Sequence, residues 1–148
     1  MGKFIFENCG DICYGRTEDE ELNKALSYGF STRNGGVSEG ALASLNLGVN
    51  RPDKHENLIE NYRRFCGSIG VDYESVVLPK QVHSSEIVSV TASDRGKRLT
   101  KPSDLPDCDG LITTDTGVAL GIFYADCTPV LLFDTRVKCL CLVHCGWS

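Results

Sequence analysis

One stretch of the chain, residues 53–69, has apolar residues at the spacing of an amphipathic helix. Asp53 followed by Glu56 is a helix start signal, and Gly67 or Gly70 supplies the stop. The apolar residues recur three and four positions apart and would share one face: Leu58, Ile59, Tyr62, Phe65, Cys66 and Ile69. We therefore expect one clear helix, with Cys66 buried as a packing residue rather than a reactive thiol.

The other apolar runs are short and bounded by turn-forming residues, a pattern typical of strands. They cover Lys3–Phe6, Leu26–Thr32, Ser75–Leu78, Glu86–Val90, Gly110–Thr113, Val118–Tyr124, Thr128–Phe133 and Cys139–Val143. Residues 92–107 are polar, contain two prolines and predict a surface loop. No internal repeat or long linker interrupts this order, so we expect a single domain over residues 1–148.

The last two apolar runs predict a β-hairpin that brings two metal-binding residue types together. Its turn would lie in Asp134–Lys138. Opposed residues of a hairpin have a constant index sum, so a register that pairs Leu132 with Cys139 also pairs Cys127 with His144. Their Cβ atoms would then lie about 4.5–5.5 Å apart. That is close enough for both side chains to bind one metal ion, or for the histidine to activate the thiol.

His83 is the candidate third ligand of such a site. Two histidines and one cysteine leave a fourth zinc position for water, which is the arrangement of catalytic zinc sites. A lone histidine between a strand and a turn is also commonly structural, and the residues alone allow both interpretations. The remaining hairpin cysteines alternate onto the face opposite His144, and their spacing is not that of a zinc knuckle: Cys139, Cys141 and Cys145.

Composition narrows the class of protein and of partner. The chain has 148 residues, a net charge of −5 and no basic cluster, so we expect no nucleic-acid partner. No apolar run reaches the roughly 18 residues of a membrane span, and we expect no membrane partner. The first residues lack the apolar core of a signal peptide, so the eight cysteines are expected to be reduced thiols of a cytoplasmic protein.

The glycine-rich segment Ser31–Gly40 has two interpretations. Its composition is that of a surface turn. It could also be a binding loop, because consecutive glycines let backbone N–H groups approach an anion while Arg33 adds positive charge.

Six motifs in order resemble the YfiH family, also called the multicopper polyphenol oxidase or laccase-like family. They are FSTRNGGVSEG, SLNLG, KQVHS, DCDGLIT, ALGIFYADCTPVLLFD and VHCGW, and they cover nearly all of the chain from Phe30 onward. The resemblance implies an α/β fold, a layered α/β/β/α sandwich with mixed sheets. It also implies a catalytic metal site at His83, Cys127 and His144, with substrate-binding polar groups at Arg33 and Asn46.

The resemblance further implies a purine nucleoside phosphorylase. Adenosine, inosine, guanosine or methylthioadenosine would react with phosphate to give a free base and ribose 1-phosphate. Zinc-dependent deamination of adenosine is implied as a second activity, in which a zinc-activated water attacks the purine ring. Asp109 and Asp126 are the candidates for its general acid–base group.

Three alternatives remain open from the sequence. The first is a copper-dependent polyphenol oxidase, although three histidines and the single methionine Met1 are a poor set for copper chemistry. The second is a hydrolase or amidase with Cys127 as nucleophile and His144 as base. The third is an inactive truncated remnant.

The last residue, Ser148, is where the chain departs from the family pattern. After the Gly-Trp pair, the family continues with a basic residue, glycine and threonine. We therefore expect the N-terminal part of a longer family fold, lacking its C-terminal portion. Such a part would expose a sheet edge, through which self-association is expected.

Overall fold

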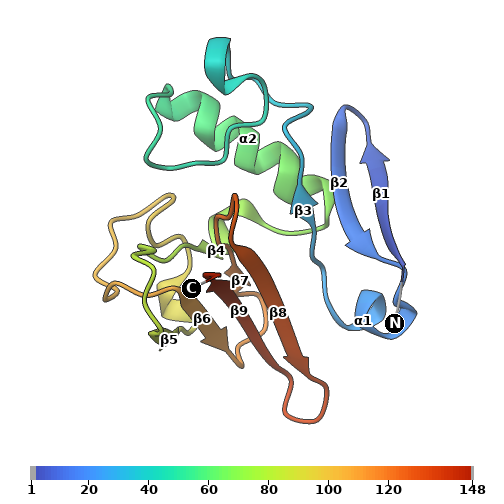
Figure 1. The fold of residues 1–148 in the computed structure, drawn as a ribbon, viewed down its shortest axis with the longest axis vertical. Helices are drawn as coiled ribbons and strands as arrows, with labels where there is room; N and C mark the ends of the chain where they lie inside the picture. The colour runs from blue at the N-terminus through green and yellow to red at the C-terminus, as the bar shows by residue number, and fades with distance from the viewer. Residues whose placement is uncertain (1–2, 148) are drawn as a thin grey trace. The chain divides into compact units, whose positions relative to one another are not determined.

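The chain forms two compact units, which we call the N-terminal unit (Met1–Tyr73) and the C-terminal unit (Glu74–Ser148). The computed structural model describes residues 3–147. Strands and helices are mixed and the sheets contain both parallel and antiparallel pairs, which confirms the α/β class (Figure 1). No helix within residues 3–147 is long and apolar enough to cross a bilayer.

The N-terminal unit contains a small antiparallel sheet with the order β1-β2-β3. Its elements are β1 (Phe4–Cys9), β2 (Ile12–Thr17), α1 (Glu20–Ala25), β3 (Phe30–Ser31), the 3₁₀ turn η1 (Gly40–Leu42) and α2 (His55–Ser68). Ile12, Tyr14 and Leu45 form the buried centre of this unit, and Phe65 and Ile69 pack against it. The apolar side of α2 therefore helps to close this core.

The predicted helix is present as α2, with a later start than expected. Leu58, Tyr62 and Cys66 are buried, which confirms the apolar stripe and the packing role of Cys66. The N-cap position is Lys54 rather than Asp53, and no side chain caps the helix there. Asp53 is instead used by the polar contacts of the preceding loop, described below.

The C-terminal unit contains a two-stranded parallel sheet and a four-stranded mixed sheet, β5-β6-β9-β8. The 3₁₀ turn η2 (Tyr73–Ser75) spans the boundary between the two units in the sequence. The elements that follow are β4 (Val76–Val77), β5 (Ile87–Ser89), η3 (Ala92–Asp94), β6 (Gly110–Thr113), β7 (Ala119–Leu120), β8 (Thr128–Asp134) and β9 (Cys139–Cys145). The core consists of Val77, Val90, Cys108, Leu111 and Val118. The β8–β9 hairpin forms one side of the larger sheet (Figure 1).

The predicted hairpin is present, but its predicted register was wrong by two residues. Leu132 faces Cys141 rather than Cys139, and His144 faces Pro129 rather than Cys127. The turn is centred one residue later than expected because Asp134 still pairs with a residue of β9, Cys139. A shift of two residues keeps each side chain on its expected face, since strand side chains alternate with a period of two.

Asp134 explains the later turn. Its carboxylate accepts hydrogen bonds from the backbone N–H groups of Arg136 at 2.8 Å and Val137 at 3.3 Å. Lys138 then closes the turn with a left-handed backbone, φ 55°. An aspartate that binds the backbone two residues ahead is a turn-forming device, and here it fixes where β8 ends.

Candidate metal centre

The structure brings together the three residues that the sequence singled out. The nearest ligand atoms of His83, Cys127 and His144 all lie within 4.8 Å of one another. The two imidazole rings meet edge to face, with centroids 4.9 Å apart. His83 is exposed, Cys127 is half-buried and His144 is buried, so the cluster has one open side. Two nitrogens and one sulfur are ligands that suit zinc or copper.

Three different segments of the C-terminal unit supply these side chains. His144 is the last residue but one of β9, and Cys127 directly precedes β8. Cys127 lies two residues from Pro129, the cross-strand partner of His144. It therefore reaches the histidine as a diagonal neighbour on the same face rather than as a directly opposed residue. His83 comes from the loop between β4 and β5.

Asp109 contacts the segments of both histidines. One carboxylate oxygen accepts from the backbone N–H of His83 at 3.0 Å and lies 2.9 Å from Nδ1 of His144. The other accepts from the N–H groups of Val82 at 3.0 Å and Ser84 at 2.7 Å, and from the Ser84 hydroxyl at 3.1 Å. Both oxygens are thus occupied, which does not suit the acid–base role considered for Asp109.

The ionisation of Asp109 fixes which nitrogen of His144 is available. Asp109 is only 1% exposed, and burial disfavours the charged form of its carboxyl. Four hydrogen bonds favour the charged form and outweigh burial, so the pKa of the carboxyl lies well below its usual range. Their donors are Ser84, Val82, His144 and His83. An ionised carboxylate can only accept, so Nδ1 of His144 carries the proton. The lone pair of Nε2 is then available for a metal ion.

Gln81 is a site residue that the sequence reasoning missed. Its side-chain amide donates to the carbonyl oxygen of Phe123 at 2.7 Å and accepts from the Phe123 N–H at 2.8 Å. This pair of bonds joins the segment of His83 to the segment that leads into Cys127. The only sequence signal was its position two residues before His83 in the KQVHS motif.

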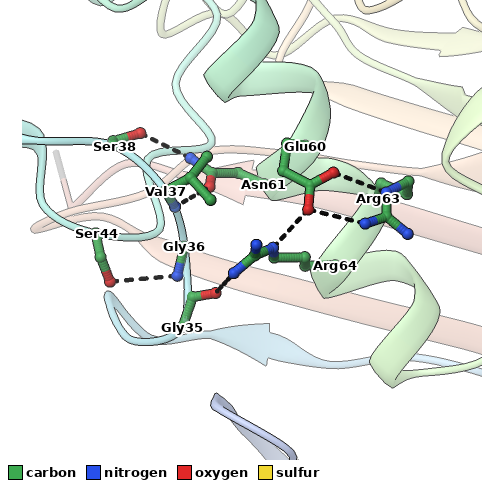
Figure 2. A network of polar contacts seen from close by, with 9 residues as sticks. All are labelled: Gly35, Gly36, Val37, Ser38, Ser44, Glu60, Asn61, Arg63 and Arg64. Carbon is green, nitrogen blue, oxygen red and sulfur yellow. Dashed lines mark hydrogen bonds and ion pairs between the residues drawn. The ribbon is translucent and has the colours of Figure 1, made fainter.

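In the glycine-rich loop of the N-terminal unit, three successive backbone donors are bound to neighbouring residues. The N–H of Gly36 donates to the Ser44 hydroxyl at 3.2 Å, and the N–H of Val37 donates to the Asn61 side chain at 2.8 Å (Figure 2). The N–H of Ser38 donates to the carbonyl of Ser44 at 2.9 Å. These donors hold the loop to its neighbours and are not directed at a ligand.

Glycine is needed in this loop for close packing. A Cβ at Gly36 would collide with the backbone of Ser44 and Leu45. Gly35 has φ 89°, and its carbonyl accepts from Arg64 of α2 at 3.2 Å (Figure 2). Arg64 also pairs with Glu60 at 2.7 Å, so the loop is attached to an ion pair on the helix.

Arg33 and Asn46, the two expected substrate-binding residues, lie in the N-terminal unit. The Arg33 guanidinium donates through Nε and Nη2 to the carbonyl of Ala43. The Asn46 amide donates to Asp53 at 2.9 Å and accepts from the N–H of Gly48 at 3.1 Å. Both side chains thus have structural partners, and the three candidate metal ligands belong to the other unit.

Residues 27–148 match the family model described as multi-copper polyphenol oxidoreductase laccase. The chain is 33% identical over 132 residues to the purine nucleoside phosphorylase YlmD of Bacillus subtilis, covering 88% of this chain and 48% of the relative. It is 36% identical over 120 residues to YlmD of Geobacillus stearothermophilus, covering 80% and 44%. The chain therefore spans about half the length of these curated relatives.

Two solved structures share the fold. The crystal structure of YlmD from Geobacillus stearothermophilus aligns with a TM-score of 0.83 and 31% identity, over 98% of this chain and 53% of that one. The crystal structure of the Bacillus licheniformis hypothetical protein YfiH aligns with a TM-score of 0.81 and 30% identity, over 96% and 52%.

Proposed function

Because this chain belongs to the multi-copper polyphenol oxidoreductase laccase family, we propose that it acts on purine nucleosides as a metal-dependent phosphorylase. The observation that carries the proposal is the convergence of His83, Cys127 and His144 within 4.8 Å in a chain whose relatives are named purine nucleoside phosphorylases. The substrates we propose are adenosine, inosine, guanosine and methylthioadenosine, each with phosphate. The products are a free base and ribose 1-phosphate.

The donor set fits zinc. Zinc bonds to imidazole nitrogen at about 2.0–2.1 Å and to thiolate sulfur at about 2.3 Å, and a small movement of three atoms already within 4.8 Å would give those lengths. His83, Cys127 and His144 would hold the ion and leave a fourth position on the open side. Zinc bound there would supply Lewis-acid polarisation of a substrate atom or of water. Copper is the alternative metal, and three histidines in the chain are few for a multicopper centre.

The chain's own residues have separable tasks in this proposal. Asp109 keeps the proton on Nδ1 of His144, so that Nε2 remains a ligand. Arg33 is proposed as the phosphate-binding cation and Asn46 as a second polar contact. The Nη1 group of Arg33 has no hydrogen bond within residues 3–147, which leaves its donors for an oxyanion.

Deamination of adenosine is the second activity that we propose for the same site. It needs a general acid–base group in addition to the metal. Asp109 is occupied by other donors, whereas Asp126 is exposed and adjacent to Cys127. We therefore propose Asp126 for this role. The eight cysteines are free thiols, and we propose that the reaction takes place in the cytoplasm, where thiols stay reduced.

We also propose that the chain associates with a second copy through β8. This strand is at the edge of the four-stranded sheet, and Leu132 on it is 57% exposed. An edge strand presents unpaired backbone donors and acceptors, and an identical strand related by two-fold symmetry can satisfy them.

The test of the proposed function is turnover. The purified zinc-loaded chain is incubated with each nucleoside, with and without phosphate, beside full-length YlmD of Bacillus subtilis as the reference for the assay. We expect phosphate-dependent release of free base and ribose 1-phosphate, and none from His83→Ala. If YlmD releases free base in the assay and this chain releases none from any of the four nucleosides, the phosphorylase proposal fails. Oxidation of phenols by the copper-loaded chain in air, without nucleoside turnover by either metal form, would favour the copper alternative.

A further inference from the structure

Two side chains outside the ligand set connect all three ligand-bearing segments. Asp109 contacts the segments of His83 and His144, and Gln81 joins the segment of His83 to the one preceding Cys127. We propose that Asp109 and Gln81 are positioning residues, which hold the three ligands at metal-binding spacing before any metal arrives. This inference rests on the metal site of the proposed function and is independent of the substrate.

The Asp109 contact fixes an unfavourable backbone conformation at His83. His83 has φ 61°, in the left-handed region that residues with a Cβ disfavour. Successive N–H groups of such a segment converge to form an anion-binding concavity. Here the anion is Asp109 itself, which accepts from the N–H groups of Val82, His83 and Ser84 at 2.7–3.0 Å. The carboxylate thus stabilises the conformation that places the His83 side chain beside His144.

The same carboxylate fixes the orientation of His144. Nδ1 of the ring lies 2.9 Å from Asp109, and the backbone N–H of His144 donates to the Asp109 carbonyl at 2.7 Å. Ring and backbone of His144 are therefore both held by one residue of the segment leading into β6. Because Asp109 and His144 are 1% and 7% exposed, water competes little for these bonds.

The Gln81 side chain bonds to Phe123 as a backbone peptide of a neighbouring strand would. Its amide replaces a backbone peptide and makes both hydrogen bonds with Phe123, at 2.7 and 2.8 Å. Phe123 lies four residues before Cys127. Losing this contact would loosen the segment of Cys127 from that of His83 beyond the β4–β7 pairing, without removing any ligand. Asparagine has the same amide on a side chain one methylene shorter, so Gln81→Asn should not reach both groups.

A site that is ordered in advance does not have to order its ligands when metal binds, and this raises affinity. Loss of contacts that orient metal ligands typically weakens metal binding about 10- to 100-fold. The inference therefore predicts a loss of affinity from substitutions that leave all three ligands in place.

The experiment measures zinc affinity by competition with a chromophoric chelator for wild type, Gln81→Ala, Gln81→Asn and Asp109→Asn. Asp115→Asn is the matched control, because the Asp115 carboxylate also accepts a backbone N–H, that of Ala92 at 2.8 Å, and within residues 3–147 it has no hydrogen bond to a ligand segment. We expect zinc dissociation constants about 10- to 100-fold higher for the first three variants and unchanged for the control. Thermal melting of the metal-free proteins verifies that each variant is folded.

A second readout needs no metal. In the metal-free protein, amide hydrogen exchange at Val82, His83 and Ser84 should become faster in Asp109→Asn and stay unchanged in Asp115→Asn. If Asp109→Asn does not fold, the two Gln81 variants carry the test. Folded Gln81→Ala with zinc affinity within twofold of wild type overturns the inference. The chain could bind zinc tightly in a Gln81-dependent way and yet turn over no nucleoside. That result would support the positioning roles and contradict the proposed function.

Discussion

Two buried or half-buried carboxylates, Asp53 and Asp109, each gather hydrogen bonds from several segments. Asp53 accepts from the Ser38 hydroxyl at 2.6 Å and from the Asn46 amide at 2.9 Å. The sequence marked Asp53 as a helix start and Asp109 as an acid–base candidate, but it did not predict these contacts, because the donors come from distant parts of the chain. The rare residue types were easier to predict: with three histidines in 148 residues, His83 and His144 were early candidates. Gln81 gave no such signal.

The contacts of Asp53 predict a particular dependence of stability on pH. The hydrogen bonds from Ser38 and Asn46 lower its pKa to about 2. A carboxyl whose pKa is depressed in the folded state contributes stability above its unfolded pKa, about 3.9, and that stability is lost as the pH falls toward 2. Denaturant unfolding of the wild type should show that its free energy of unfolding falls steeply between pH 5 and pH 2.

The comparison with Asp53→Asn isolates this carboxyl. The variant should be less stable than wild type at pH 5, and the difference should shrink as the pH approaches 2. Glu56→Gln, an exposed substitution in the first turn of α2, is the control and should follow wild type. A stability difference between wild type and Asp53→Asn that stays constant from pH 5 to pH 2 would contradict the assignment.

At the scale of elements, periodicity predicted which faces are buried better than it predicted where elements begin and end. The stripe that includes Leu58 and Tyr62 is buried, yet α2 starts later than expected because Asp53 is used by tertiary contacts. The hairpin has the predicted faces but a register shifted by two residues, since Asp134 sets the turn. The error preserved the proximity of Cys127 to His144 because it was an even number of residues.

The exposed edge of β8 predicts concentration-dependent association. Light scattering across a concentration series should show the mass rising from one chain toward two. Leu132→Lys places a charge on the edge strand and should keep the chain monomeric. Val137→Lys is the matched control, since Val137 is 63% exposed but lies in the turn, and it should associate like wild type. A wild-type chain that stays monomeric throughout would contradict association through β8.

At the scale of the whole molecule, the order of the motifs predicted the α/β class and the family, since each motif lies on a different segment. The single domain over residues 1–148 stays a prediction. The chain forms two compact units, a division that neither composition nor linkers indicated. The family match covers residues 27–148 and so includes parts of both units. The candidate ligands all belong to the C-terminal unit, which can therefore be tested for metal binding through its own residues.

Metal content measured by mass spectrometry on the purified, dialysed chain tests the central claim most directly. We expect about one zinc per chain, the stoichiometry of an open three-ligand site. His83→Ala, Cys127→Ala and His144→Ala should each lose most of the metal. Cys139→Ala and Cys141→Ala should keep it, because these cysteines alternate onto the other face of β9 from His144. Zinc content unchanged in all three ligand variants would contradict the site.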